Sequence, residues 1–148
     1  MLRQISIGLL FAVVVGALLY RTFGPPSDPK PTAEFGGVSL RLDYATSTEA
    51  QERGLSGRTN LPANYGMLFV FEKDGRYGFW MKDMLVPVDI FWLNGKRQVV
   101  AISQNVSTST YPYVFYPPEP VRYVLETAAG FARDHAIATG TALRLINP

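Results

Sequence analysis

The hydrophobic pattern divides the chain into two unlike parts. Residues 5–20 (ISIGLLFAVVVGALLY) carry no charge and have no polar stripe, whereas from residue 35 apolar and polar residues alternate with a period of two. A long uncharged run without a polar face is typical of a membrane segment, and a period of two predicts β-strands. We therefore expect an N-terminal apolar segment followed by one β-rich domain.

Short strands account for most of the predicted domain. Asp74-Gly75 is typical of a turn and predicts that two strands pair around it, and Asn94-Gly95 predicts a second hairpin closed by a type I′ turn. We expect strands at residues 37–44, 66–71, 76–81, 88–93, 96–102, 121–126 and 142–146.

Two short helices complete the prediction. Residues 47–53 form the first, with Thr46-x-x-Glu49 or Thr48-x-x-Gln51 as its capping box and Gly54 as its end. Residues 128–136 form the second, and residues 103–120 form a long loop with one irregular strand. The resulting fold class is mainly β: a single antiparallel β-sandwich or closed barrel with two short helices, preceded by a transmembrane helix.

The N-terminal region predicts a tether. We assign residues 1–23 to a signal anchor, residues 24–34 to a proline-rich linker and residues 35–148 to the domain. An apolar segment so near the N-terminus normally exports the rest of the chain, so we expect a single-pass membrane protein with an extracytoplasmic domain. If the segment is cleaved as a signal peptide, the domain is instead secreted.

Charge and composition exclude several kinds of function. From residue 33 onward the chain has 11 basic and 11 acidic residues, so the domain is neutral and we expect no nucleic acid partner. Cysteine is absent and His135 is the single histidine, which excludes disulfides, zinc–thiolate sites and any site built on two histidines. We expect no cofactor. No standard enzyme motif is present, which favours a binding protein over an enzyme, and His135 near a helix end needs no catalytic role.

Charged residues concentrate around residues 79–89 (FWMKDMLVPVD). Asp89 and Glu126 are acids on otherwise apolar strands, and Arg53 and Arg58 flank the first predicted helix. The structural interpretation, which we favour, is a buried arginine–carboxylate network that joins helix to sheet. The functional interpretation is a pocket for a small polar ligand, with candidate residues Arg53, Trp80, Lys82, Asp83, Asp89 and Glu126.

Two other kinds of chemistry stay open. A hydrolase could use Asp89 and Glu126 as an acid–base pair, provided that both face one cavity within about 5–10 Å of each other. A Cu(I) site could use Met67, Met81 and Met84, since soft thioethers suit that ion, although methionines more often fill gaps in a core.

Several motifs together indicate a family. They are residues 52–58 (ERGLSGR), 66–71 (GMLFVF), 79–84 (FWMKDM), 87–90 (PVDI) and 123–126 (YVLE). In this order and spacing, from about residue 36 to 146, the chain resembles the domain of unknown function 192 family, also called uncharacterised protein family 0127. The resemblance implies a compact, mainly β fold, often exported or membrane-anchored, and implies no established activity, substrate or cofactor.

Two positions depart from the family pattern. Ser56 stands where the family often has methionine, which weakens a thioether site, and Asp83 stands where asparagine is frequent, which argues against an obligatory acid. Our first functional hypothesis is a membrane-tethered accessory module that binds a small ligand or a glycan of the cell envelope. The aromatic residues 111–116 (YPYVFY) could add a stacking surface, or could pack onto the sheet and cover an edge strand.

Overall fold

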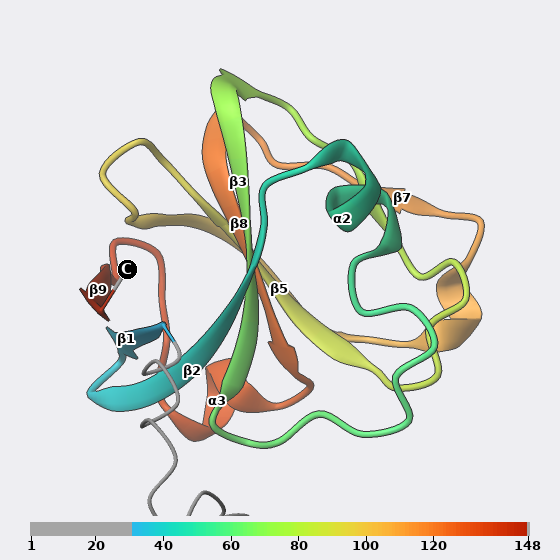
Figure 1. The fold of residues 1–148 in the computed structure, drawn as a ribbon, viewed down its shortest axis with the longest axis horizontal. Helices are drawn as coiled ribbons and strands as arrows, with labels where there is room; N and C mark the ends of the chain where they lie inside the picture. Colours follow the sequence, from blue (N-terminus) through green and yellow to red (C-terminus); the bar gives the residue numbers. More distant parts are fainter. Residues whose placement is uncertain (1–30, 148) are drawn as a thin grey trace, which may run out of the picture.

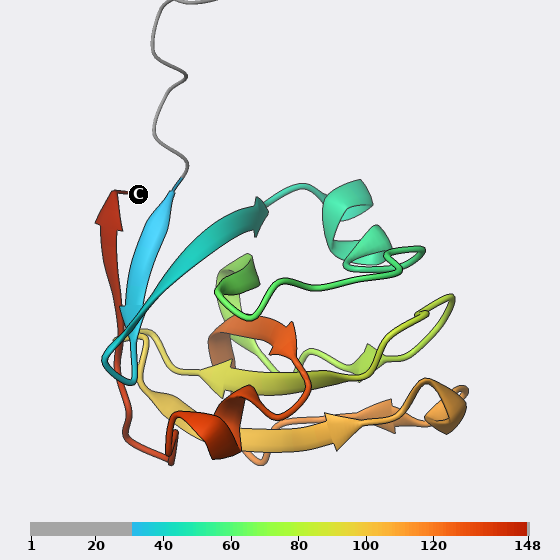
Figure 2. The same ribbon diagram turned by 90° about the horizontal axis from the view of Figure 1, so that it is seen from below.

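A computed structural model describes residues 31–147. Within this range seven strands form one curled sheet in the order β6-β5-β8-β3-β2-β1-β9, and two short strands, β4 and β7, pair separately. Figures 1 and 2 show the sheet bending around on itself as a half-barrel, with α2 and α3 at different sides. The strands are β1 (Thr32–Phe35), β2 (Val38–Ala45), β3 (Tyr65–Gly75), β4 (Phe79–Trp80), β5 (Val88–Leu93), β6 (Val99–Val106), β7 (Val114–Phe115), β8 (Val121–Ala128) and β9 (Leu143–Asn147), and the helices are α2 (Thr48–Arg53), η1 (Thr108–Thr110) and α3 (Phe131–Asp134).

The predicted mainly β class with two short α-helices is confirmed, and of the two predicted architectures the barrel is the nearer to the observed half-barrel. The antiparallel sandwich is wrong in two respects. First, β2 and β3 pair in parallel, because the chain crosses over through α2 between them. Second, one curled sheet takes the place of two stacked sheets. Its edges approach at one end, where Gln98 bridges Ala142 and the Leu143 N–H donates to the Arg97 carbonyl over 2.9 Å.

One predicted hairpin forms and the other does not. β5 and β6 pair as expected, but the turn is wider than type I′: the Asn94 side chain accepts from the N–H groups of Lys96 and Gln98, and Arg97 takes a φ of 58°. The hairpin expected around Asp74-Gly75 is wrong. β3 is apolar on both faces and pairs with β2 and β8 instead, whereas β4 pairs with β7.

The sheet has apolar residues on both faces. On the α2 side the core includes Phe69, Ile90 and Val124, and on the α3 side it includes Leu68, Phe91 and Leu125. Neighbouring residues of one strand thus alternate between the two cores, as a pleated strand requires. This alternation decides where each acid on β5 and β8 points.

The N-terminal predictions fall mostly outside the described residues. Residues 1–23, the predicted anchor, lie outside that range, as do residues 24–30 of the predicted linker. The linker's last residues belong to β1, which pairs with β2 and β9, so the sheet begins at Thr32 and not at residue 35. Between residues 31 and 147, no helix combines the length and the apolar character needed to cross a membrane.

Candidate functional site

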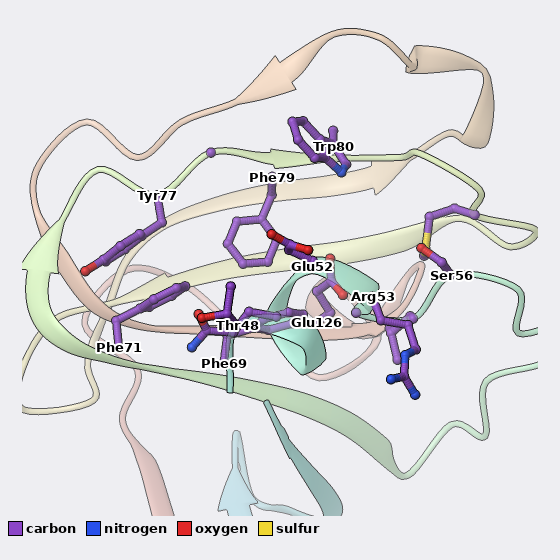
Figure 3. A pocket seen from close by; sticks show the side chains of 15 residues that line it. Thr48, Glu52, Arg53, Ser56, Phe69, Phe71, Tyr77, Phe79, Trp80 and Glu126 are labelled. Atoms are coloured by element: carbon purple, nitrogen blue, oxygen red, sulfur yellow. The ribbon is translucent and has the colours of Figure 1, made fainter. Parts of the chain in front are cut away.

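A cavity of about 250 Å³ opens on the α2 side of the sheet. Its walls come from α2 and the loop after it, from β3, from residues 77–80 and from β8 (Figure 3). We call it the Glu126 pocket. It is lined by Thr48, Gln51, Glu52, Arg53, Gly54, Leu55, Ser56, Phe69, Phe71, Tyr77, Gly78, Phe79, Trp80, Met84 and Glu126.

Glu126 supplies the buried acid of this pocket. It lies on β8 between Met67 of β3 and Ile90 of β5, which places it in the middle of the sheet, and only 4% of its surface is exposed. No described residue donates a hydrogen bond to its carboxyl group or forms an ion pair with it. Burial raises the pKa of Glu126 to about 8, because the charged form loses its hydration. At neutral pH the carboxyl group therefore holds a proton.

Aromatic rings form much of the wall. The rings of Phe69 and Phe79 meet edge to face with centroids 4.8 Å apart, and those of Phe71 and Tyr77 stack at 3.5 Å. In Figure 3 the Phe69 and Phe79 rings lie around the Glu126 side chain, whereas the Trp80 indole projects from the other side of the strand that carries Phe79. Trp80 is 50% exposed, which leaves its ring available to a ligand. The pocket thus combines a single buried acid with an apolar, largely aromatic surround.

Helix α2 covers one side of the pocket and is held there by polar contacts. The side chain of Ser47 caps it by accepting from the Ala50 N–H, so the N-cap is Ser47 and neither Thr46 nor Thr48. The Gln51 amide donates to the carbonyl groups of Ala45 and Val70, over 3.3 and 2.8 Å, and so joins the helix to β2 and β3.

Gly54 ends α2, as predicted, at a φ of 50° that favours glycine. A Cβ atom at this position would lie 3.4 Å from the Phe69 ring and 3.9 Å from the Glu126 Oε2 atom. A side chain here would extend over the carboxyl group. Glycine at this position therefore allows the helix to end and leaves the Glu126 carboxyl group accessible.

The other charged residues of the predicted pocket lie at its outer edge. Arg53, Lys82 and Asp83 are exposed and line a second hollow beside the first, and the Arg53 guanidinium points away from Glu126 in Figure 3. The loop after α2 is tied to this turn, because Ser56 donates to the Lys82 carbonyl over 3.0 Å. Asp83 takes a φ of 56°, a conformation that asparagine and aspartate adopt more readily than most residues.

Asp89 is not part of the pocket. It is fully buried on the α3 side, where Oδ1 accepts from the Asn105 N–H over 2.7 Å and Oδ2 from the Ala132 N–H over 2.8 Å. The second bond caps the first turn of α3. On β8 the residue opposite Asp89 is Thr127, one position from Glu126, so the two acids point to opposite faces of the sheet.

Two predictions are therefore wrong. The buried arginine–carboxylate network does not form, since backbone N–H groups bind Asp89, and Arg58 pairs with Asp43 over 3.1 Å. The acid–base pair of Asp89 and Glu126 does not form, because the two acids point to opposite faces of the sheet and Asp89 does not line the Glu126 pocket. The two residues lie on adjacent paired strands, where a shift of one position reverses the face.

The comparisons place the chain in a protein family. The family model described as "Uncharacterized ACR, COG1430", the domain of unknown function 192, matches residues 32–145. The chain belongs to this family. The match covers almost all of the described residues and confirms the resemblance seen in the motifs, and no curated protein matches the chain.

Two solved structures are similar to this domain of unknown function 192 protein. One, from Sinorhizobium meliloti 1021, is described as a "putative transcription regulator"; it is 25% identical, has a TM-score of 0.74, and the alignment covers 82% of this chain and 98% of that one. The other, a protein of unknown function from Novosphingobium aromaticivorans DSM 12444, is 26% identical with a TM-score of 0.69, over 81% of this chain and 89% of that one.

All three candidate methionines are core residues. Met67, Met81 and Met84 are buried in the α2-side core, and of the three only Met84 lines the Glu126 pocket. His135 lies on the α3 side, where its ring packs 4.4 Å from the Phe131 ring. The structure therefore supports the core-filling interpretation of the thioethers.

The tyrosines of residues 111–116 are exposed. Tyr111, Tyr113 and Tyr116 are 50%, 64% and 62% exposed, while β7 within this segment pairs with β4 next to the pocket. We call these three exposed rings the tyrosine surface, and none of them lines the Glu126 pocket.

Of the aromatic residues that line the pocket, only Trp80 is among the candidate residues that the sequence suggests. Phe69 and Phe71 are two positions apart, as are Tyr77 and Phe79, so each pair projects from one face of its segment. That spacing is a usable signal. Apolar alternation alone, however, places these rings only in the core.

Proposed function

We propose that this protein is a membrane-anchored, extracytoplasmic binding module that holds a small polar or glycan-like ligand in the Glu126 pocket. The observation that carries the proposal is the Glu126 carboxyl group, which is buried without a partner among the described residues in a pocket lined with aromatic rings. Ligand sites commonly combine apolar walls with a few polar groups that fix orientation.

Binding is better supported than catalysis. A buried carboxyl group without a hydrogen bond destabilises the folded chain, and a ligand that donates a hydrogen bond would offset that loss. A two-carboxylate mechanism lacks its second acid here, because Asp89 lies on the other face. The Sinorhizobium relative is described as a transcription regulator, but the 11 basic and 11 acidic residues after residue 32 make this domain neutral, which does not favour DNA binding.

Tryptophan fluorescence of the full-length chain tests the proposed pocket. Trp80 is 50% exposed at the pocket whereas Trp92 is 1% exposed, so a bound ligand should change the Trp80 emission and leave Trp92 unaffected. We expect envelope-derived monosaccharides or small polar extracts to produce this change. Trp80→Phe should abolish the signal and Trp92→Phe should keep it.

A second measurement separates the pocket from the tyrosine surface. By calorimetry, Trp80→Ala should weaken binding about three- to tenfold, which corresponds to the loss of about 0.5–1.5 kcal/mol of ring contact. Tyr113→Ala, which removes a ring that is 64% exposed and outside the pocket, should have no effect. A loss on Tyr113→Ala alone would place the ligand on the tyrosine surface and contradict the proposal.

The tether has its own test. Residues 5–20 are uncharged and apolar, so the full-length chain should sediment with membranes and resist a high-salt wash that removes charge-bound proteins. A protease added outside spheroplasts should cut within the proline-rich residues 24–31 and release the domain. Protection in intact spheroplasts followed by cleavage after lysis would contradict the extracytoplasmic orientation. A mature N-terminus near residue 18 or 25 would show a secreted domain instead.

A further inference from the structure

We infer that the ligand of the Glu126 pocket is a small organic cation, a protonated amine whose ammonium group pairs with the Glu126 carboxylate and whose apolar body lies against the aromatic rings. This inference rests on the proposed binding function and narrows its ligand class.

No described residue supplies a counter-charge to Glu126. The ionisable side chains that line the pocket with Glu126 are Glu52 and Arg53 of α2 and Tyr77. Glu52 and Arg53 are exposed, and the Arg53 guanidinium points away from Glu126. Among the described residues none gives Glu126 an ion pair or a hydrogen bond. A buried carboxylate is stable when a cation pairs with it, and this pocket leaves that partner to a ligand.

Aromatic rings line the pocket around Glu126. Phe69, Phe79 and Trp80 line the pocket together with Glu126. The face of an aromatic ring attracts a cation, and most strongly when the cation is desolvated. A neutral ligand of the same shape would receive the apolar contact but neither the ring attraction nor the ion pair. The combination of rings and one acid therefore selects for positive charge.

The volume of the cavity limits the size of the ligand. At about 250 Å³ the cavity is smaller than the roughly 300–1,000 Å³ of sites for drug-sized ligands. It suits an amine with a single ring or a short alkyl chain. An ammonium group that carries N–H donors can also satisfy the carboxylate oxygens by hydrogen bonding, which a quaternary ammonium group cannot.

The pairing predicts a pH dependence. Because burial raises the pKa of Glu126 to about 8, an incoming ammonium group must displace the carboxyl proton at lower pH. The affinity should therefore rise about tenfold per pH unit from pH 6 towards 8 and then level off, while the amine itself stays protonated to about pH 9. Of the other ionisable side chains that line the pocket, Glu52 and Arg53 are exposed and the Tyr77 hydroxyl donates to the Lys73 carbonyl, so we assign this rise to Glu126.

The test is a calorimetric titration of the full-length chain with benzylammonium and, as the neutral isostere, benzyl alcohol. At pH 8 we expect benzylammonium to bind at least tenfold more tightly, with proton release in buffers at pH 6.5. Glu126→Gln should abolish both the preference and the pH dependence. Glu52→Gln should weaken binding only a few-fold, because that acid is solvated, and Glu34→Gln on β1 should leave it unchanged.

The outcomes separate this inference from the function on which it rests. Equal affinity for benzylammonium and benzyl alcohol, both sensitive to Trp80→Ala, would overturn the cation inference and keep the binding pocket. Absence of binding for both probes and for the envelope extracts would overturn both. If Glu126→Gln lost binding through misfolding, it would show a lowered melting temperature. In that case the pH dependence of binding and the proton release measured on the unaltered chain decide whether the ammonium group pairs with Glu126.

Discussion

Glu126→Gln is expected to stabilise the folded domain at pH 7 by about 3 kcal/mol. Glu126 has a pKa of about 8 in the folded domain against an ordinary value of 4.5. Between these values the folded state binds more protons than the unfolded state, so Glu126 makes stability fall as pH rises from 4.5 to 8. Each pH unit in this window corresponds to about 1.4 kcal/mol, and glutamine removes the dependence because it does not ionise.

Chemical denaturation of both chains from pH 4 to 9 measures this effect. The two stability curves should coincide near pH 4, where Glu126 is protonated in both states, and separate progressively up to pH 8. Glu72→Gln, which changes an exposed acid on β3, is the matched control and should track the unaltered chain. A Glu126→Gln curve parallel to that of the unaltered chain would show that Glu126 has an ordinary pKa. A gain in stability on losing an acid is typical of a residue kept for function.

Asp89→Ala is expected to destabilise the domain by about 3–5 kcal/mol. The side chain is fully buried and accepts hydrogen bonds from the N–H groups of Asn105 and Ala132. Its removal leaves two N–H groups without their partners, at about 1–3 kcal/mol each, and opens a small cavity on the α3 side. The cause of this loss is the removal of backbone capping, because the expected pairing of Asp89 with an arginine does not form.

Two variants make the Asp89 result interpretable. Asp74→Ala removes an exposed partner of Arg122, whose Nε lies 2.7 Å from Asp74 Oδ1, and should change stability by less than about 1 kcal/mol. Asp89→Asn keeps the size but turns an N–H donor toward one backbone N–H group, so its loss should be intermediate. A loss below about 1 kcal/mol for Asp89→Ala would contradict the capping role. Both variants are compared by urea denaturation at pH 7.

The sequence predicted local structure well where one segment's own pattern was sufficient. β2 follows its alternation of apolar and polar residues, α2 ends at Gly54, and the β5–β6 hairpin forms around Asn94. Prediction failed for pairing over long range. β3 is apolar on both faces, and nothing in residues 66–71 specifies that β2 and β8 are its neighbours. Only the crossover through α2 decides that β2 and β3 are parallel.

The candidate site shows the same division. The sequence predicts Arg53, Trp80 and Glu126 as residues of one polar pocket. All three line the Glu126 pocket. Asp89 is predicted for the same reason and lies on the opposite face. The register between β5 and β8 decides which groups a buried acid can contact. A shift of one position would turn the acid to the other face of the sheet.

The sequence by itself determined the family, the mainly β class, the neutral charge of the domain and the list of residues able to carry chemistry, because these depend on composition and local spacing. The tertiary structure alone decided which acid is structural and which lies in a pocket. Asp89 is satisfied by two backbone N–H groups that come from β6 and α3, distant in sequence. Glu126 has no such donor among the described residues. The segments that fold over it, which are α2 with its end, β3 and residues 77–80, contribute aromatic rings and Gly54 instead. Burial is a property of the assembled sheet, and burial is what separates the roles of these two acids.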